Sequence, residues 1–238
     1  MMRSVRHMAV ALGAAAGLAG AALPAAAGSE SGNFMVRALG TVVAPDASGS
    51  VTDQAGVVSG AVGHIPGSDA DVSTEVIPAL TLSYFLNQNL ALELFCCFAK
   101  HQADAEGSIK GLGEVADTWI FPPAVTLQYH FTGMGSLKPY VGAGFQYIYF
   151  FDEKSDYGNV EIDDAFGFTL QAGLDISMGG GWYLNADVKK TWLDTEVHWT
   201  DAGLKGDVDI DPWIFSLGVG YRFNLEDLFG SRTEAALK

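Results

Sequence analysis

Acid–base side chains that could take part in catalysis are few and scattered along the chain. The histidines after residue 27 are His64, His101, His130 and His198. Three of them fall in segments without a regular hydrophobic pattern, and the fourth ends a patterned segment. Their spacing therefore brings no base, nucleophile and orienting group together. The sequence also lacks the G-x-S-x-G nucleophile elbow. We interpret His130 as a hydrogen-bonded interior side chain and predict that the protein is not an enzyme.

Three aspartates near the C-terminus alternate along the chain. Asp207, Asp209 and Asp211 would share one face of a strand, and hard divalent cations take such oxygen ligands. They lack the glycine-containing loop of a calcium-binding motif. The adjacent Cys96 and Cys97 would point to opposite faces of a strand, so a disulfide between them would be strained. The sequence therefore assigns no metal site and no cofactor.

The elements that must position these side chains are short strands in which apolar and other residues alternate. Segments of about ten residues follow one another after residue 33, with large apolar side chains at every second position and Gly-, Asp- or Asn-rich breaks between them. The opposite face is small and mixed. A membrane barrel turns its large apolar side chains outward and leaves the rest to a narrow lumen. We count eight strands, over residues 33–43, 75–86, 90–100, 118–131, 138–151, 166–178, 182–193 and 208–223.

The connections between these strands alternate in length. Residues 87–89, 132–137 and 179–181 are short, whereas 44–74, 101–117, 152–165 and 194–207 are long. Outer-membrane barrels combine short periplasmic turns with longer external loops, and an even strand number places both termini in the periplasm. The pattern therefore predicts an all-β fold, an eight-stranded antiparallel transmembrane β-barrel.

The first 27 residues differ in composition from the rest. Arg3 and Arg6 precede an uncharged apolar stretch over 8–23, and the small residues 25–27 form a cleavage site. These are the features of a secretory signal peptide. We thus divide the chain into a signal peptide (1–27), a barrel (28–223) and a periplasmic tail (224–238), and expect export to the outer membrane.

The net negative charge of the chain argues against nucleic acid as a partner. Without residues 1–27 the chain keeps 11 basic and all 28 acidic residues, a formal charge of −17. Such an acid excess argues against nucleic-acid binding, because phosphates need Lys or Arg partners. Much of the acid falls in the long connections, which predicts a solvated, acidic external face.

The inward faces of the strands sort by depth into a polar and an apolar half. Toward the short turns they predict a polar floor of Arg37, Glu93, Gln128, His130, Gln171, Asp175, Asn185, Asp187 and Arg222. Charges in such a narrow space should pair, because isolated ones are costly. Toward the long loops they predict an apolar lining, which includes Leu39, Ile77, Ile120, Pro122, Ile148, Phe150, Leu193, Ile210 and Ile214. These side chains either fill the barrel or surround a pocket for one small apolar molecule.

Prolines interrupt the predicted strands. Pro122 and Pro123 lie together in one strand, and Pro78 and Pro212 lie in two others. Proline cannot donate to a β-ladder and marks a bulge, a strand end or an unpaired edge. Pro122 and Pro123 are therefore candidates for a lateral gate, through which a ligand would leave into the membrane. Bulges that only shape the barrel are the alternative.

Several stretches resemble the OmpW family of small outer-membrane barrels. They are GNFMVR (32–37), NLALEL (89–94), PPAVTLQYHF (122–131), KPYVGAG (138–144) and GYRF (220–223). The resemblance covers essentially the whole chain after the signal peptide. It implies an eight-stranded barrel with a narrow apolar interior that passes small hydrophobic molecules inward. The fifteen residues after Phe223 depart from it, since barrels of this kind usually stop at the terminal aromatic residue.

Three functions compete at this point. The first is passive uptake of small hydrophobic molecules through the apolar upper lumen. The second is a structural or surface-interaction role, in which acidic loops contact cations, lipopolysaccharide, host surfaces or phage. The third, given least weight, is a lipid-modifying enzyme. The expected partners are outer-membrane lipid, small hydrophobic solutes and the outer-membrane assembly machinery; the sequence does not define the oligomeric state.

Overall fold

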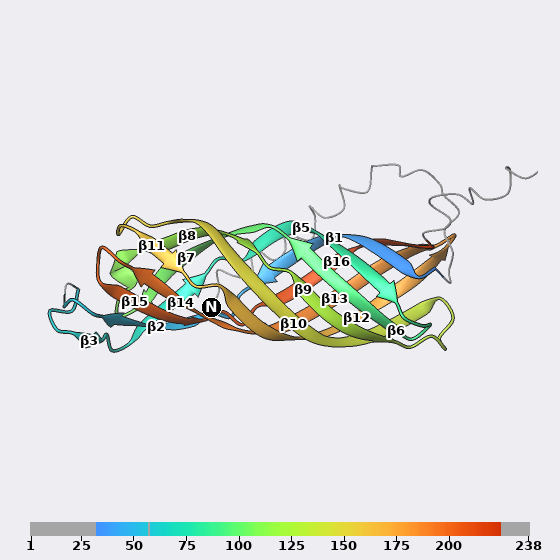
Figure 1. Cartoon of the computed structure of the whole chain (residues 1–238), viewed down its shortest axis with the longest axis horizontal. Helices are drawn as coiled ribbons and strands as arrows, with labels where there is room; N and C mark the ends of the chain where they lie inside the picture. Colours follow the sequence, from blue (N-terminus) through green and yellow to red (C-terminus); the bar gives the residue numbers. More distant parts are fainter. Residues whose placement is uncertain (1–31, 57, 225–238) are drawn as a thin grey trace, which may run out of the picture.

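The computed structural model describes residues 32–56 and 58–224. The predicted signal peptide (1–27) and residues 225–238 of the predicted tail lie outside this part of the chain. Within it, eight strands close into an antiparallel barrel, which confirms the predicted fold class (Figure 1). In order around the barrel they are β1 (Phe34–Ala44), β5 (Glu75–Phe85), β6 (Leu90–Cys97), β9 (Ala124–His130), β10 (Leu137–Lys154), β12 (Ala165–Gly179), β13 (Trp182–Trp192) and β16 (Trp213–Phe223).

The strand faces follow the sequence alternation. In β1, Met35, Arg37 and Leu39 are buried inside the barrel, while the residues between them face outward. The outward apolar side chains are not covered by other protein groups: Leu80 and Phe145 are each 54% exposed and Phe166 is 64% exposed. Successive side chains of a strand point to opposite faces, so the period of two alone produces an apolar outer band.

One end of the barrel is closed by short turns and holds the two described chain ends. Phe34 at the start of β1 pairs with Phe223 at the end of β16. The turn between β12 and β13 consists of glycines with φ values of 86°, 62° and 84° at Gly179, Gly180 and Gly181. A side chain would disfavour this left-handed backbone, so glycine is what makes so short a turn feasible.

The long connections are not irregular loops, contrary to the prediction. They form β2 (Ser48–Asp53), β3 (Gly63–His64), β4 (Ser68–Val72), β7 (Ala99–Gly107), β8 (Glu114–Phe121), β11 (Val160–Ile162), β14 (Asp194–Trp199) and β15 (Leu204–Asp209), with a short 3-10 helix at Lys110–Leu112. No helix in the described ranges is long and apolar enough to cross a membrane. Pairing satisfies the backbone groups that an irregular loop would leave to water.

These added strands extend the barrel beyond its loop-side rim. In the described residues, β11, β14, β15, β2 and β3 form a second sheet, and β4, β7 and β8 continue the barrel sheet (Figure 1, left). Apolar side chains of the second sheet and of the barrel-sheet extension pack against one another and form a core, with Val51, Ile109, Val197 and Leu204 among its members. The hydrophobic interior therefore continues past the barrel proper.

Three strands predicted as continuous are interrupted. The predicted strand 90–100 breaks at Phe98, between β6 and β7. The strand 118–131 breaks at Pro122 and Pro123, between β8 and β9, because proline offers no N–H to the ladder. The strand 208–223 also breaks, before β16, where Asp211 has a φ of 39°. All three breaks lie toward the loop side.

Candidate functional site

A cavity of about 90 Å³ lies inside the loop-side half of the molecule. On the same measure a water molecule needs about 10–15 Å³, so the free space exceeds that of several waters. Of the residues predicted to form the apolar lining, the structure places six on its wall: Ile120, Pro122, Ile148, Phe150, Ile210 and Ile214. The other three, Leu39, Ile77 and Leu193, belong to the apolar clusters packed around it rather than to the wall.

The wall is built from both loop-side sheets. Val115 of β8 and Trp199 of β14 both line the cavity, and the indole Nε1 of Trp199 donates a hydrogen bond of 3.0 Å to the Val115 carbonyl. This bond joins the extension of the barrel sheet to the second sheet. The single polar atom of a large apolar side chain is thereby satisfied while its ring faces the interior.

The cavity has a histidine on its wall that sequence reasoning placed in a loop. His101 lies in β7, is 6% exposed, and its Nδ1 is 2.8 Å from the Ser73 carbonyl oxygen. Burial lowers the pKa of His101 below its ordinary value, although the bond to Ser73 and the charge of Glu75 oppose this. The imidazole is therefore held in its neutral form near pH 7.

Below the cavity, Arg37 forms the centre of the polar floor. Its Nε and Nη2 atoms donate to the two oxygens of Asp175 at 3.1 and 2.6 Å, a bidentate pair. Its Nη1 atom donates to Glu93 at 2.9 Å and to Ser83 at 2.7 Å. Arg37 and Glu93 are each 1% exposed, so these charges are held by each other rather than by water.

A second cation in the floor, Lys189, was missed by the sequence reasoning. Its Nζ atom lies 2.5 Å from Asp187 Oδ1 and 3.4 Å from Glu93 Oε1. Lys189 shares the inward face of β13 with Asn185 and Asp187, so the alternation that identified those two residues contained the signal for it as well. Glu93 thus lies between two cations.

The remaining predicted floor residues complete one hydrogen-bond network. Gln171 donates to Glu93 at 2.9 Å and to Asp187 at 2.7 Å. The other contacts are Gln128 Nε2 to Gln171 Oε1 at 3.1 Å, His130 Nε2 to Gln128 Oε1 at 3.0 Å, and Asn185 Nδ2 to Asp175 Oδ1 at 2.8 Å. Eight of the nine residues predicted as floor therefore lie together and are buried. The ninth, Arg222, is also buried, but its Nε donates to the Gly32 carbonyl at 2.6 Å.

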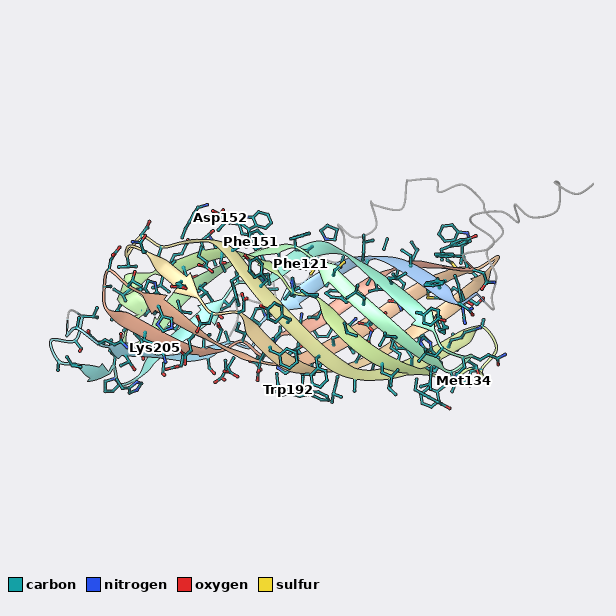
Figure 2. The ribbon with its side chains drawn as sticks, viewed as in Figure 1. Phe121, Met134, Phe151, Asp152, Trp192 and Lys205 are labelled. Carbon is teal, nitrogen blue, oxygen red and sulfur yellow. The ribbon has the colours of Figure 1, made fainter. Side chains whose placement is uncertain are left out.

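The backbone pairing of the barrel wall is interrupted beside the cavity, and we call this interruption the gap. The β6–β9 ladder ends at Phe95 opposite Ala124, and the β7–β8 ladder begins at Ala99 opposite Ile120. Within the described residues, the ladder between these two pairs is interrupted at Pro122 and Pro123. Outside the gap, the ring of Phe98 stacks on Phe121 at 4.9 Å and meets Phe151 edge-on at 6.5 Å. Figure 2 shows Phe121 and Phe151 near each other where the barrel meets its loop-side extension.

The external face carries acidic groups near a histidine. Asp163, Glu196 and His198 offer ligand atoms within 4.8 Å of one another. Glu196 also lies 2.9 Å from Lys205, and this hydrogen bond lowers the pKa of Glu196. Of the three aspartates with alternating positions, Asp211 directs its carboxylate to the Leu193 backbone N–H at 3.0 Å.

Comparison with known proteins agrees with this architecture. The OmpW family matches residues 30–223. An outer-membrane protein of Sinorhizobium fredii (y4mB) is 40% identical over 174 residues, 69% of this chain and 73% of its own. Outer membrane protein W of Vibrio cholerae is 30% identical, over 82% of this chain and 90% of its own. "Dibenzothiophene metabolism operon protein PahQ" of Pseudomonas aeruginosa is 24% identical, over 67% of this chain and 77% of its own.

A solved structure shows the same fold. The crystal structure of the outer membrane protein OprG of Pseudomonas aeruginosa superposes with a TM-score of 0.72 at 29% identity, covering 83% of this chain and 98% of that one. The barrel closure, the apolar outer band and the match over nearly all described residues agree with one another. The chain is a protein of the outer membrane and belongs to the OmpW family.

Proposed function

We propose that this protein is a narrow passive pathway by which small hydrophobic molecules cross the outer membrane. A solute enters the loop-side cavity and leaves sideways through the gap at Pro122 and Pro123. The observation that carries the proposal is the position of an almost wholly apolar cavity directly beside that gap. Apolar solutes gain free energy by leaving water for such a wall.

The polar floor supports lateral rather than axial exit. The Arg37, Glu93, Asp175 and Lys189 side chains fill the lumen below the cavity and are each 1% exposed. An apolar solute cannot replace the hydrogen bonds that it would have to break there, so the floor opposes passage along the barrel axis. The gap needs no such exchange, because proline leaves ladder positions without donors.

The name of one relative agrees with an apolar solute. PahQ is named for a dibenzothiophene metabolism operon, and dibenzothiophene is a fused aromatic molecule with little polarity. The cavity of this chain offers the matching chemistry, with Phe95, Phe150 and Trp199 on its wall. A solute of this type gains both burial and ring contacts.

The test is the initial uptake rate of a small apolar probe by cells that express the protein, at limiting probe concentration. Ile120→Asp with Ile148→Asp puts two charges on the cavity wall and should reduce uptake to the rate of cells without the protein. The matched control is Val58→Asp with Val62→Asp, because these side chains are 43% and 75% exposed in the first loop-side connection. Equal uptake by the two double variants would refute the pathway.

A surface-interaction role has one structural feature in its favour. Across β14 and β15, Asp194 lies opposite Asp209 and Glu196 lies opposite Asp207, around an exposed groove. Facing carboxylates of this kind attract divalent cations of the lipopolysaccharide layer. Replacing the four acids by Asn or Gln should then weaken the protein's binding of lipopolysaccharide in calcium-containing buffer and leave probe uptake unchanged.

A further inference from the structure

His101 presents an unused hydrogen-bond acceptor in an apolar cavity. Its Nδ1 lies 2.8 Å from the carbonyl oxygen of Ser73, and a carbonyl oxygen can only accept a hydrogen bond, so Nδ1 is the donor. The neutral ring therefore carries its proton on Nδ1 and a lone pair on Nε2. In the part of the chain that the structure describes, Nε2 has no hydrogen-bond partner. The side chain lies on the cavity wall and is 6% exposed.

The other polar side chains of the wall are already used. The Gln146 amide donates to the Pro122 carbonyl at 3.3 Å and accepts from Thr191 at 2.7 Å. Thr195 Oγ1 donates to the Asp163 carbonyl at 2.5 Å. Thr118 Oγ1 donates to a backbone carbonyl at 3.2 Å, and Gln102 Nε2 donates to Glu114 at 3.1 Å. Gln102 is exposed, so among the buried polar side chains of the wall His101 differs in keeping a ring-nitrogen acceptor free.

We propose that His101 is a specificity residue, and that its Nε2 accepts a hydrogen bond from a solute that is apolar except for one donor, such as a phenol or an alkanol. This inference rests on the proposed uptake pathway and narrows its substrate class. The cavity around His101 is largely apolar, so a solute that brings a donor to Nε2 gains a hydrogen bond that the wall does not otherwise supply. A site built around a hydrogen bond discriminates against analogues that lack the donor.

The pair of probes that isolates this bond is 1-naphthol and naphthalene, which share one ring system and differ by a single hydroxyl. Cys97 reports occupancy, because it lines the cavity whereas Cys96 belongs to the outward face of β6. In a Cys96→Ser background, in lipid vesicles, the probe concentration that halves Cys97 alkylation measures binding. Comparing variants with the same probe cancels the partition of that probe into lipid.

His101→Phe should raise the half-protecting concentration of 1-naphthol by about threefold to tenfold, the effect of one neutral hydrogen bond. Naphthalene should protect equally in both proteins. His101→Gln keeps a carbonyl acceptor and should recover part of the 1-naphthol binding. The control is Thr118→Val, whose hydroxyl is already bonded, and it should not separate the two probes.

Naphthalene protection with a 1-naphthol affinity that does not depend on residue 101 would overturn the role of His101 and leave the pathway standing. Failure of both probes to protect Cys97 would overturn the pathway as well. A second measurement does not depend on the folding of a variant. In ¹⁵N-histidine-labelled wild-type protein, the Nε2 resonance of His101 should report an unprotonated nitrogen, and it should shift with 1-naphthol and not with naphthalene. An Nε2 resonance that responds equally to both probes would contradict the proposal.

Discussion

The ammonium of Lys189 lies 4.9 Å from the centre of the Phe95 ring, and this contact separates two chemically different halves of the lumen. Phe95 belongs to the apolar cluster at the base of the cavity. On the side of Phe95 away from the cavity, Lys189 pairs with Asp187 and Glu93. A cation–ring contact therefore lies at the boundary between the apolar cavity and the charged floor, and it is favourable because the ring face carries partial negative charge.

Replacing Lys189 by Met should strongly destabilise the barrel. The substitution keeps the volume but leaves the buried Glu93 and Asp187 with one cation fewer, and breaking such a pair costs about 3–5 kcal/mol. Urea unfolding in lipid vesicles, followed by tryptophan fluorescence, measures the change. Lys154→Met is the control: its pair with Asp152 is exposed, with side chains 64% and 53% accessible, and is worth at most about 1 kcal/mol. Equal losses in the two variants would contradict the role given to the floor.

Gly173 leaves room for the ring of Tyr140, which lies opposite it across β10 and β12. A Cβ at residue 173 would overlap that ring, whose hydroxyl donates to Asp187 at 2.9 Å. We expect Gly173→Val to cost about 1–3 kcal/mol of unfolding free energy, as overpacking does. In a Tyr140→Ala background the same substitution should cost much less, since the two sites share one space. Additive effects in the double variant would show that Gly173 has another role.

The inward faces could be predicted from the sequence because a strand period of two leaves only two choices. Arg37, Glu93 and Asp175 are therefore found together in the floor as predicted, although 138 residues separate the first from the last. Alternation does not, however, predict how far along the barrel axis an inward side chain lies. Leu39 and Leu193 face inward as predicted yet lie outside the cavity wall, because depth depends on the register and tilt of neighbouring strands.

The loop-side strands and His101 could not be predicted in the same way. Their outer faces are acidic, as in Glu196 and Asp207, so the hydrophobic contrast with a solvated loop is weak. Their inward side chains, such as Val197 and Trp199, can be recognised as one face of a strand only when the hairpin pairing is known. His101 was missed for the same reason. The direction of a side chain is undefined in an irregular loop, whereas in β7 the alternation turns His101 toward the interior.

Closing the wall gap should slow uptake without emptying the cavity. Pro122→Val with Pro123→Val restores two ladder donors, and β-branched residues favour the extended pairing that the prolines interrupt. Uptake of an apolar probe should fall severalfold, while protection of Cys97 by naphthalene stays unchanged. Pro139→Val is the control, since Pro139 lies in β10 opposite Leu174, next to the short turn at the other end of the barrel. An uptake rate equal to that of wild type would exclude exit through this part of the wall.

Acid should destabilise the protein through His101. Burial holds the folded-state pKa of this residue below the ordinary value of about 6.5, so the unfolded chain binds the proton more readily. The contribution of His101 to the unfolding free energy is therefore fully present above the ordinary pKa and declines as the pH falls through the folded-state value. Between about pH 7.5 and about pH 5, His101→Gln should lose less stability than wild type. Parallel profiles of the two proteins would contradict this assignment.

The Asp53 carboxylate organises the tip of the first loop-side connection. It accepts backbone N–H groups from Ala55, Gly56, Val58 and Ser59, at 3.2, 2.6, 2.8 and 2.9 Å. Hydrogen bonds to a charged acceptor are stronger than neutral ones, so we expect Asp53→Ala to raise the rate of proteinase K cleavage within 54–62 by about tenfold or more. Asp71→Ala is the control, because Asp71 accepts only from its neighbour Val72, at 3.1 Å, among the hydrogen bonds seen in the described chain. Cleavage should remain confined to the tip, since β2 stays paired with β15. Cleavage that spreads into 48–53 would instead mean that Asp53 holds the whole second sheet together.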